Sequence, residues 1–165
     1  TWAMVEETVA RLPAEKPRYL MGVGSPEDIV AAVARGIDIL DSALPTRVAR
    51  NGALFTAKGR RNIRNAAYRK MDAPFDPSCG CYTCRRFSAA YLHHLFRAGE
   101  LLAYRLATLH NLCFLQDLME KIREAVRGDT FPEFAADFLA HYRVTDEATR
   151  RQQKQRWLDS PKRLR

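Results

Sequence analysis

Residues 18–47, RYLMGVGSPEDIVAAVARGIDILDSALPTR, decide the fold class of this chain. Two short apolar runs, RYLMGVG and IDILDSAL, flank the segment from Ser25 to Gly36, whose S-x-x-D start and apolar spacing predict a capped helix. A strand, a helix and a strand joined by short connections predict a βαβ unit with parallel, buried strands. Functional groups in such units gather at the carboxyl ends of the strands, here residues 21–25 and 41–47. The sequence therefore predicts an α/β fold with its site at that edge.

The composition is that of a folded chain with a basic surface. Of the 165 residues, 47% are hydrophobic and 28% are charged, and the formal net charge is +8. This apolar content can offset the entropy of ordering, and the positive charge favours polyanionic partners such as nucleic acid. No run approaches the roughly 20 apolar residues of a membrane span, and the first residues carry Glu6 and Glu7 rather than a basic leader. We therefore expect a cytoplasmic protein with no membrane partner.

The remaining segments carry simpler signals. Residues 1–12 have the spacing of an amphipathic helix, and residues 53–63 predict a small hairpin at the surface that turns near Gly59. After the proline-bearing stretch 71–77, apolar steps of three and four residues predict helices bounded by glycines, and a last helix beginning near Pro132. We expect three parts: βα units with the hairpin in 1–70, a cysteine-bearing subdomain with helices in 71–144, and a basic tail in 145–165.

Three cysteines crowd into a C-x-C-x-x-C motif that is typical of a metal site. Cys79, Cys81 and Cys84 would bring three thiolates around one point, and His110 in the helix that follows would complete a Cys3His set. Such a set is common in closed tetrahedral zinc sites, so we expect one structural Zn²⁺ per chain. An iron–sulfur cluster and unrelated buried thiols are the alternatives.

Two other histidines compete with His110 for the fourth position. His93 and His94 are nearer to the cysteines in sequence, but adjacent residues on a helix point about 100° apart, so at most one of them could face the metal. Cys113 lies one helical turn after His110, where we expect packing rather than ligation.

Asp41 interrupts an apolar strand near its carboxyl end. Burying a carboxylate is costly unless the group is paired or used, so Asp41 is either catalytic, the cap of a turn, or the partner of Arg47. Asp38, three residues earlier, is expected to be structural. Arg47 and Arg50 lie in a segment that we interpret as a loop suited to phosphate and base contacts, although many such loops are only solvated.

Taken together, PRYLMGVGSPEDI, GIDILDSALPTRVARNGALFT, NIRNAAY, CGCYTC and YLHHLFRAGELLAYRLATLHNL resemble the C-terminal half of bacterial queuine tRNA-ribosyltransferases, also called tRNA-guanine transglycosylases. The resemblance runs from about Pro13 to about Tyr142. It implies the C-terminal part of a TIM (β/α)8 barrel with an inserted zinc-binding subdomain, in which the two strands are the seventh and eighth. The first six strands, with the second aspartate of the family, are not in this sequence.

The resemblance also implies a reaction and a role for each matching residue. The enzymes exchange the wobble guanine of U-G-U anticodon tRNAs for a 7-deazaguanine precursor of queuosine, and Asp41 matches the nucleophile that forms a covalent tRNA intermediate. Ser42 departs from the cysteine usual in bacterial members. The other implied roles are a base pocket at Met21 and Gly22; tRNA contacts from the loop Gly22, Val23, Gly24, Ser25, Pro26, Glu27, Asp28 and the loop Thr46, Arg47, Val48, Ala49, Arg50; zinc ligation by Cys79, Cys81, Cys84 and His110; and a homodimer interface at Phe87, Tyr91 and His94.

Two other functional interpretations fit part of the sequence. A truncated, noncatalytic module of the same family would keep zinc, tRNA binding and dimerisation without chemistry. A zinc-based regulator that binds nucleic acid explains the charge and the metal motif, but it explains neither the βαβ unit nor the LPTR segment at 44–47. Asp41 is the feature that distinguishes an enzyme from both.

Overall fold

The computed structural model describes residues 2–143 and residue 155, so the predicted basic tail 145–165 falls almost wholly outside the described residues. No described helix has the length and apolar content needed to cross a membrane. In chain order the elements are α1 (Trp2–Val9), β1 (Tyr19–Leu20), α2 (Pro26–Val33), β2 (Ile39–Leu40), α3 (Leu44–Arg50), β3 (Ala53–Thr56), β4 (Gly59–Asn62), the 3-10 helix η1 (Ala66–Tyr68), α4 (Tyr82–Arg86), α5 (Ala89–Ala98), α6 (Leu101–Arg127) and α7 (Phe131–His141).

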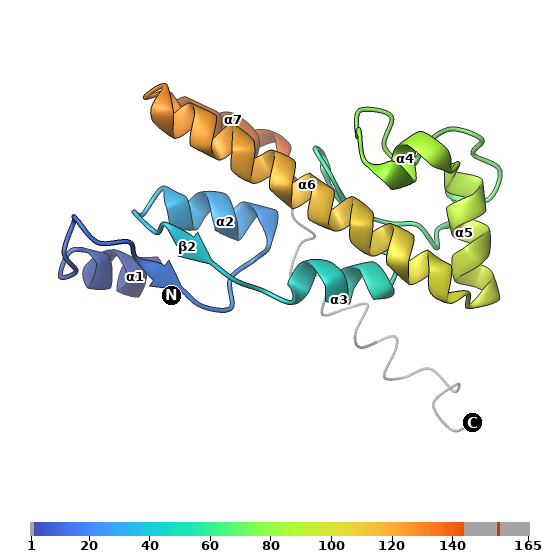
Figure 1. Ribbon diagram of the computed structural model, residues 1–165, viewed down its shortest axis with the longest axis horizontal. Coiled ribbons are helices and arrows are strands. Elements are labelled where there is room, and N and C mark those ends of the chain that lie inside the picture. The colour runs from blue at the N-terminus through green and yellow to red at the C-terminus, as the bar shows by residue number, and fades with distance from the viewer. Residues whose placement is uncertain (1, 144–154, 156–165) are drawn as a thin grey trace.

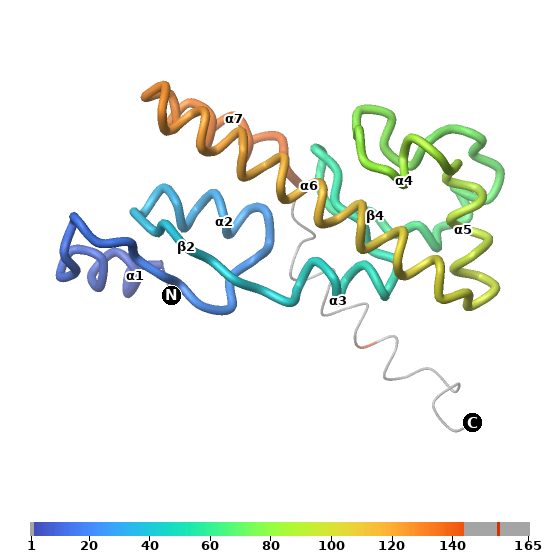
Figure 2. The backbone as a smooth tube through the Cα atoms, in the orientation of Figure 1, coloured from blue at the N-terminus to red at the C-terminus, as the bar shows by residue number. Residues whose placement is uncertain are grey.

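The long helix α6 runs through the molecule and connects its two ends (Figure 1). Its first half packs against α3, the β3–β4 hairpin, α4 and α5, and its second half packs against α2 and α7. Each end has its own hydrophobic core, one that includes Leu54, Leu92 and Leu106 and one that includes Val30 and Ile122. The backbone trace in Figure 2 shows β2 leading directly into α3 beneath α6. The helix therefore fixes the position of the segment that follows Asp41.

The βαβ prediction is confirmed in its pairing and in its helix cap. Strands β1 and β2 are parallel, with Tyr19 opposite Ile39. The Ser25 hydroxyl accepts the backbone N–H of Asp28 at 3.3 Å and donates to the Asp28 carboxylate at 2.7 Å, while Pro26 occupies the first turn. The first of these bonds is the N-cap interaction that satisfies a free N–H group of a helix start, and the second holds the Ser25 hydroxyl in place.

The prediction that these strands are buried is wrong for this chain. Tyr19 is 51% exposed, Ile39 is 48% exposed and Met21 is 71% exposed. Side chains alternate along a strand, so these three share one face of the ribbon with Asp41, and Leu20 and Leu40 lie on the other. Only the second face has a cover, since Leu40 packs on the core of α2, α6 and α7. The first face is open because no described element lies over it.

The end of the second predicted strand is helical instead. We expected IDILDSAL to continue as strand and Thr46–Arg50 to be loop, but β2 ends at Leu40 and α3 spans Leu44–Arg50. Proline in the first turn is compatible with a helix, because the missing N–H has no partner there in any case, and Pro45 occupies that turn. The Ser42 hydroxyl accepts the N–H of Leu44 at 3.1 Å, which satisfies one of the first free donors.

The hairpin was placed correctly along the chain, but it is not a surface feature. Strands β3 and β4 pair antiparallel with Thr56 opposite Gly59, as the spacing predicted. Leu54, Phe55 and Ile63 are 0%, 2% and 0% exposed, and β3 packs against both α6 and α3. The accessible residues are the arginines of β4, whereas β3 belongs to the core, so the basic composition of the hairpin concealed a buried strand in the sequence.

The predicted helix boundaries hold in the second half of the chain. α5 ends at Gly99, whose φ of 77° closes a left-handed cap, and α6 ends at Arg127 before Gly128. α7 begins at Phe131, next to the expected Pro132. The three aromatic residues predicted to be buried in and just after α7 differ in burial. Tyr142 is buried, whereas Phe134 and Phe138 are only partly buried.

Asn111 joins three elements through its side chain. It is fully buried; its Oδ1 accepts the N–H of Phe55 at 3.0 Å, and its Nδ2 donates to the carbonyls of Pro45 and Ala53, both at 3.0 Å. Every polar atom of the amide is therefore used. The result is a fixed connection between α6, the start of α3 and β3.

Replacing Asn111 with Ala should remove all three of these hydrogen bonds and leave the buried N–H of Phe55 without the acceptor that it has here. Each unsatisfied buried group costs about 1–3 kcal/mol, so we expect Asn111→Ala to lower the free energy of unfolding by about 3 kcal/mol or more in a denaturant titration. Asn65→Ala is the matched control, because Asn65 is exposed and its side chain makes no helix-capping bond. An equal, small effect of both substitutions would contradict this role.

Candidate functional site

The four predicted metal ligands come together in one cluster. Cys81 is the N-cap of α4, Cys84 lies within α4, Cys79 lies two residues before the cap, and His110 reaches the cluster from α6. The three sulfur atoms and a ring nitrogen all lie within 4.8 Å of one another, and none of the cysteines forms a disulfide. Cys81, Cys84 and His110 are buried, and Cys79 is partly buried. The arrangement is that of a closed metal-binding group.

The distances within the cluster fit tetrahedral zinc. The His110 Nδ1 atom lies 3.6, 3.5 and 3.4 Å from the sulfurs of Cys79, Cys81 and Cys84. Zinc bonds of about 2.3 Å to sulfur and about 2.0–2.1 Å to nitrogen, meeting at a tetrahedral angle, separate the two ligand atoms by about 3.5 Å. Four protein ligands complete this geometry and leave no position for a reacting water. The zinc is structural.

Groups around the ligands prepare them for a cation. The His110 Nε2 atom donates to the carbonyl of Phe55 at 2.7 Å, which leaves the lone pair of Nδ1 for the metal. Hydrogen bonds from Cys79 and then Cys84 hold the pKa of the Cys81 thiol far below its usual range. One thiolate is thus stabilised by its neighbours, and the imidazole ring is held with Nδ1 toward the three sulfurs.

The competing ligands lie outside the cluster. His93 is buried, but its Nδ1 donates to the carbonyl of Ile63 at 2.8 Å, and His94 is exposed. Cys113 packs at the edge of the core as expected, and burial together with the nearby charge of Asp117 raises its pKa to about 11. His110 is therefore the fourth ligand.

Asp41 is held at the end of β2 by two donors to one oxygen. The Tyr19 hydroxyl donates to Oδ1 at 2.7 Å and the Gly22 N–H donates to the same atom at 3.1 Å. The side chain is exposed rather than buried, for the reason given for the strands. Among the described residues it makes no ion pair with Arg47, so that alternative is not supported. Oδ2 has no hydrogen-bond partner in the described part of the chain.

The hydrogen bonds to Asp41 decide the charge states of Asp41 and of Tyr19. The hydrogen bond from Tyr19, followed by that from Gly22, holds the pKa of Asp41 below its usual value. The same hydrogen bond to Asp41 raises the pKa of the Tyr19 hydroxyl. Asp41 is therefore an ionised carboxylate with a neutral phenol beside it at neutral pH.

Asp41 opens onto a pocket that both predicted tRNA segments share. The pocket has a volume of about 340 Å³, and Gly22–Ser25 and Asp28 line it from one side, Ser42–Leu44 and Arg47 from the other. The glycine loop lies against the residue after Asp41, since a Cβ added to Gly24 would stand 2.2 Å from Cβ of Ser42. Met21, predicted to line the base pocket, is highly exposed and does not line this one. The folding of the βαβ unit thus joins the two segments at the carboxylate.

The predicted tRNA-binding residues differ in accessibility. Arg47 and Arg50 are exposed on α3, and Thr46 is partly exposed. Val48 and Ala49 face the core, and Gly24 and Pro26 are buried as well. The side chains that could reach RNA are therefore fewer than the sequence interpretation named.

The three predicted interface residues gather near the start of α5. The rings of Phe87 and Tyr91 are stacked, with centroids 5.4 Å apart and an angle of 16° between their planes. Tyr91 and His94 are exposed, while Phe87 is partly buried. The three residues provide an aromatic strip on the surface.

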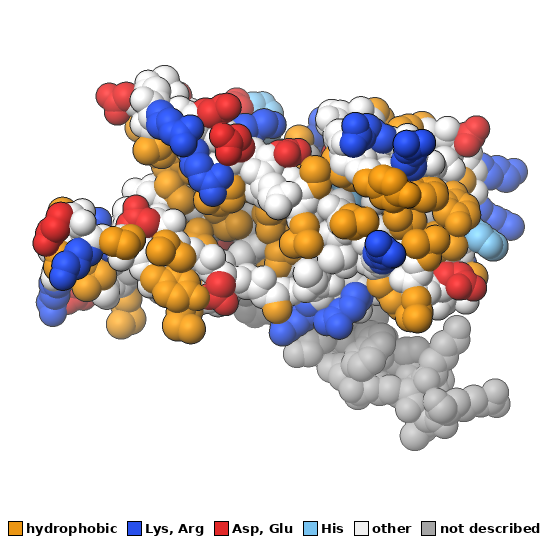
Figure 3. Space-filling view, viewed as in Figure 1, with side chains coloured by type: hydrophobic (Ala, Val, Ile, Leu, Met, Phe, Trp, Pro, Cys, Tyr) orange, Lys and Arg blue, Asp and Glu red, His pale blue; other side chains and the backbone are white. Residues whose placement is uncertain are grey.

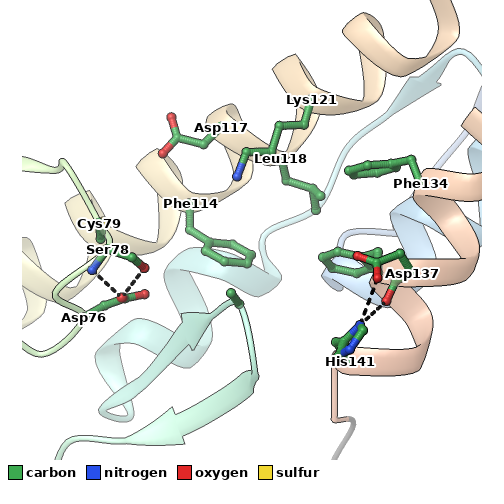
Figure 4. A pocket seen from close by; sticks show the side chains of 12 residues that line it. Asp76, Ser78, Cys79, Phe114, Asp117, Leu118, Lys121, Phe134, Asp137 and His141 are labelled. Carbon is green, nitrogen blue, oxygen red and sulfur yellow. Dashed lines mark hydrogen bonds and ion pairs between the residues drawn. The ribbon is translucent and has the colours of Figure 1, made fainter. Parts of the chain in front are cut away.

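Another pocket lies between α6, α7 and the loop before Cys79 (Figure 4). It has a volume of about 250 Å³; Phe114, Leu118, Phe134 and Phe138 supply its apolar wall. Two acidic residues also line the pocket: Asp76 accepts two hydrogen bonds from Ser78, and Asp137 pairs with His141 at 3.2 Å. Neither Asp41 nor either predicted tRNA segment lines it. The pocket therefore takes no part in the site at Asp41.

Two residues of the site were missed in the sequence. Tyr19 was read only as part of an apolar strand, although its position two residues before Met21 puts it on the face that Asp41 shares. Asn111 directly follows the zinc ligand His110, and a polar residue in an apolar helical stretch was the available signal. Both act by positioning backbone or a carboxylate, which short motifs do not reveal.

Zinc content should depend on the four ligands and not on the remaining cysteine. We expect about one zinc per chain by mass spectrometry of metals, and well below half of that in Cys81→Ser after dialysis against a chelator, because one thiolate is lost from a four-coordinate site. Cys113→Ser is the control and should keep its zinc. Zinc loss in both variants would argue against the assignment.

Tyr19→Phe should raise the pKa of Asp41. The phenol stabilises the charged carboxylate, so its removal favours the protonated form and shifts the titration toward the ordinary value for aspartate. The midpoint can be followed by NMR of the Asp41 carboxyl carbon from pH 2 to 6. An unchanged midpoint would mean that this hydrogen bond does not form in solution. Tyr91→Phe, on a different surface, should leave the midpoint where it is.

Comparison with known proteins agrees with this geometry. The family model described as queuine tRNA-ribosyltransferase matches residues 1–144. A queuine tRNA-ribosyltransferase of Dehalococcoides mccartyi is 60% identical over 158 residues, which are 96% of this chain and 40% of that protein. One from Herpetosiphon aurantiacus is 56% identical over 90% of this chain and 38% of its own length, and one from Thermoanaerobacter pseudethanolicus is 54% identical over 87% and 38%. The chain thus spans about two fifths of the length of these relatives. On the evidence of its sequence and its Cys3His zinc centre, the chain belongs to the queuine tRNA-ribosyltransferase family.

Proposed function

We propose that this chain supplies the nucleophile and part of the tRNA-binding surface for exchange of the wobble guanine in U-G-U anticodons. The product would carry a 7-deazaguanine precursor of queuosine. The observation that carries the proposal is the state of Asp41: ionised, held through Oδ1, and free at Oδ2 beside a pocket formed by both predicted tRNA segments. A carboxylate in this state is suited to nucleophilic catalysis at a sugar carbon.

The chemistry follows from these roles. Oδ2 of Asp41 attacks the anomeric carbon of the wobble nucleotide while the bond to guanine N9 breaks. Guanine leaves with the electron pair of that bond and takes up a proton from water, which is left as hydroxide. The carboxylate favours the reaction by stabilising positive charge at that carbon before it bonds to it. The incoming base then gives up its N9 proton to that hydroxide and forms its bond to the same carbon, and Asp41 leaves as a carboxylate. The donors on Oδ1 stabilise the charged form, so they favour the second step.

The surface around Asp41 supplies candidates for RNA contact. Arg47 and Arg50 are exposed on α3 and make no ion pair within the described residues. Guanidinium groups match phosphate oxygens in pairs, so free arginines beside the nucleophile suit an anticodon loop. The loop Gly22–Asp28 borders the same pocket and would touch the RNA from its other side.

Zinc and the aromatic strip would act away from the chemistry. The zinc holds α4 and its loop against α6. The strip of Phe87, Tyr91 and His94 is proposed to be a homodimer interface, since exposed aromatic side chains are enriched at such surfaces.

The role of Asp41 can be tested in a chimera that joins this chain to the N-terminal part of the D. mccartyi relative. We expect labelled guanine to enter a U-G-U anticodon tRNA. Asp41→Asn should lower the rate by about a thousandfold or more, because an amide is a far weaker nucleophile. Asp72→Asn, an exposed acidic residue in another segment, is the control and should change the rate less than about twofold.

The outcomes separate the proposed function from its alternative. Equal activity of the parent and Asp41→Asn would show that another group is the nucleophile. If the chimera exchanges no base although the 165-residue chain binds zinc and tRNA, the noncatalytic tRNA-binding module is correct instead.

A further inference from the structure

We infer that a third pocket, which is basic and lies between η1 and α5, binds a phosphate group of the RNA backbone. The inference rests on the proposed function, in that it adds a contact for the same kind of RNA. This pocket has a volume of about 610 Å³, and its lining consists of Arg64, Ala66, Arg69, Ala90, His93, His94 and Arg97. Three guanidinium groups and two imidazoles thus surround one space, with no carboxylate in its lining.

The arginines are available to a ligand. Arg69 and Arg97 are exposed, and within the described part of the chain neither side chain has an ion pair or a hydrogen bond. Like charges that face one pocket repel one another, and an anion between them removes that repulsion. The guanidinium group can bind two phosphate oxygens at once, so phosphate is the anion that this lining fits best.

Two of the lining side chains are fixed in place before any ligand arrives. The Arg64 guanidinium lies over the ring of Phe96, with its central carbon 5.2 Å from the ring centroid. His93 is buried, and its Nδ1 donates to the Ile63 carbonyl, so its ring is a fixed part of the pocket wall rather than a donor to the phosphate. Groups that are already ordered lose less entropy on binding, so the pocket is partly organised for its ligand.

The pocket lies close to the end of the helix that carries the proposed anticodon contacts. α3 carries Arg47 and Arg50 and ends just before Gly52, and a Cβ added to Gly52 would lie 3.2 Å from Cγ of Arg64. Basic and histidine side chains also gather at the end of the molecule where α5 lies (Figure 3). An RNA strand at α3 could therefore extend along a basic track to this pocket.

A second copy of the chain is the competing occupant, because His94 also belongs to the predicted dimer interface. The aromatic strip lies beside the pocket on α5 and could pair with another chain without the arginines. The chain has a formal net charge of +8, so a second copy would bring more positive charge to a basic surface. RNA brings the opposite charge, and the observations favour it.

The test compares two double variants of the 165-residue chain that lose the same charge. Arg69→Gln/Arg97→Gln empties the pocket of two cations, whereas Lys121→Gln/Arg127→Gln removes two exposed cations at the opposite end of α6. Binding of a fluorescent U-G-U anticodon stem-loop is measured by anisotropy at several salt concentrations. We expect about tenfold weaker binding and a salt slope lower by about one for the pocket variant, and less than about twofold change for the control.

Parallel measurements identify the ligand and separate this inference from the proposed function. Unchanged RNA affinity in the pocket variant, with affinity lost in Arg47→Gln/Arg50→Gln, would overturn the pocket and leave the proposed function standing. Absence of RNA binding by the parent chain would contradict both. Tight binding of inorganic phosphate by calorimetry, with RNA affinity unchanged, would show a small-anion site instead. Dimer loss in ultracentrifugation, again with RNA affinity unchanged, would assign the pocket to the protein interface.

Discussion

The ligation of one metal by His110 and three cysteines is the interaction on which the rest of the structure depends. His110 lies on α6, and its second ring nitrogen holds the carbonyl of Phe55 in the hairpin. The next residue, Asn111, fixes the start of α3 and β3. Two adjacent side chains therefore connect the metal loop, the hairpin and the segment that follows Asp41. A small domain that lacks a single large core gains stability from such a centre.

The sequence predicted those features that depend on local chemistry. The cap at Ser25, the parallel pairing of the two strands, the glycine stop at Gly99 and the Cys3His cluster each arise from bonds within a few residues or from ligand types that only a metal brings together. The residues that form each of these features are themselves visible in the sequence, and the structure confirms the features. The family assignment follows from the same motifs.

The features that were predicted wrongly depend on distant partners. The hairpin was expected at the surface because β4 is rich in arginine, but the burial of Leu54 is decided by α6, about fifty residues later. The strand face with Tyr19 and Ile39 was expected to be buried, and it is exposed because no described element packs over it, which its own residues do not reveal. Tyr19 was missed as the partner of Asp41 for the same reason, since the register of two strands sets that contact.

The order of the zinc ligands along the chain has a consequence for synthesis on the ribosome. The three cysteines are complete at Cys84, and the histidine follows 26 residues later, at position 110 (110 − 84 = 26). At about 5–20 residues per second, the thiolates wait roughly one to five seconds for their fourth partner. Because His110 arrives within a long helix, closing the metal centre and docking α6 on the hairpin are one event. The nascent chain thus holds an incomplete, reactive thiol site until that helix emerges, and exposure to oxidants is greatest during this interval.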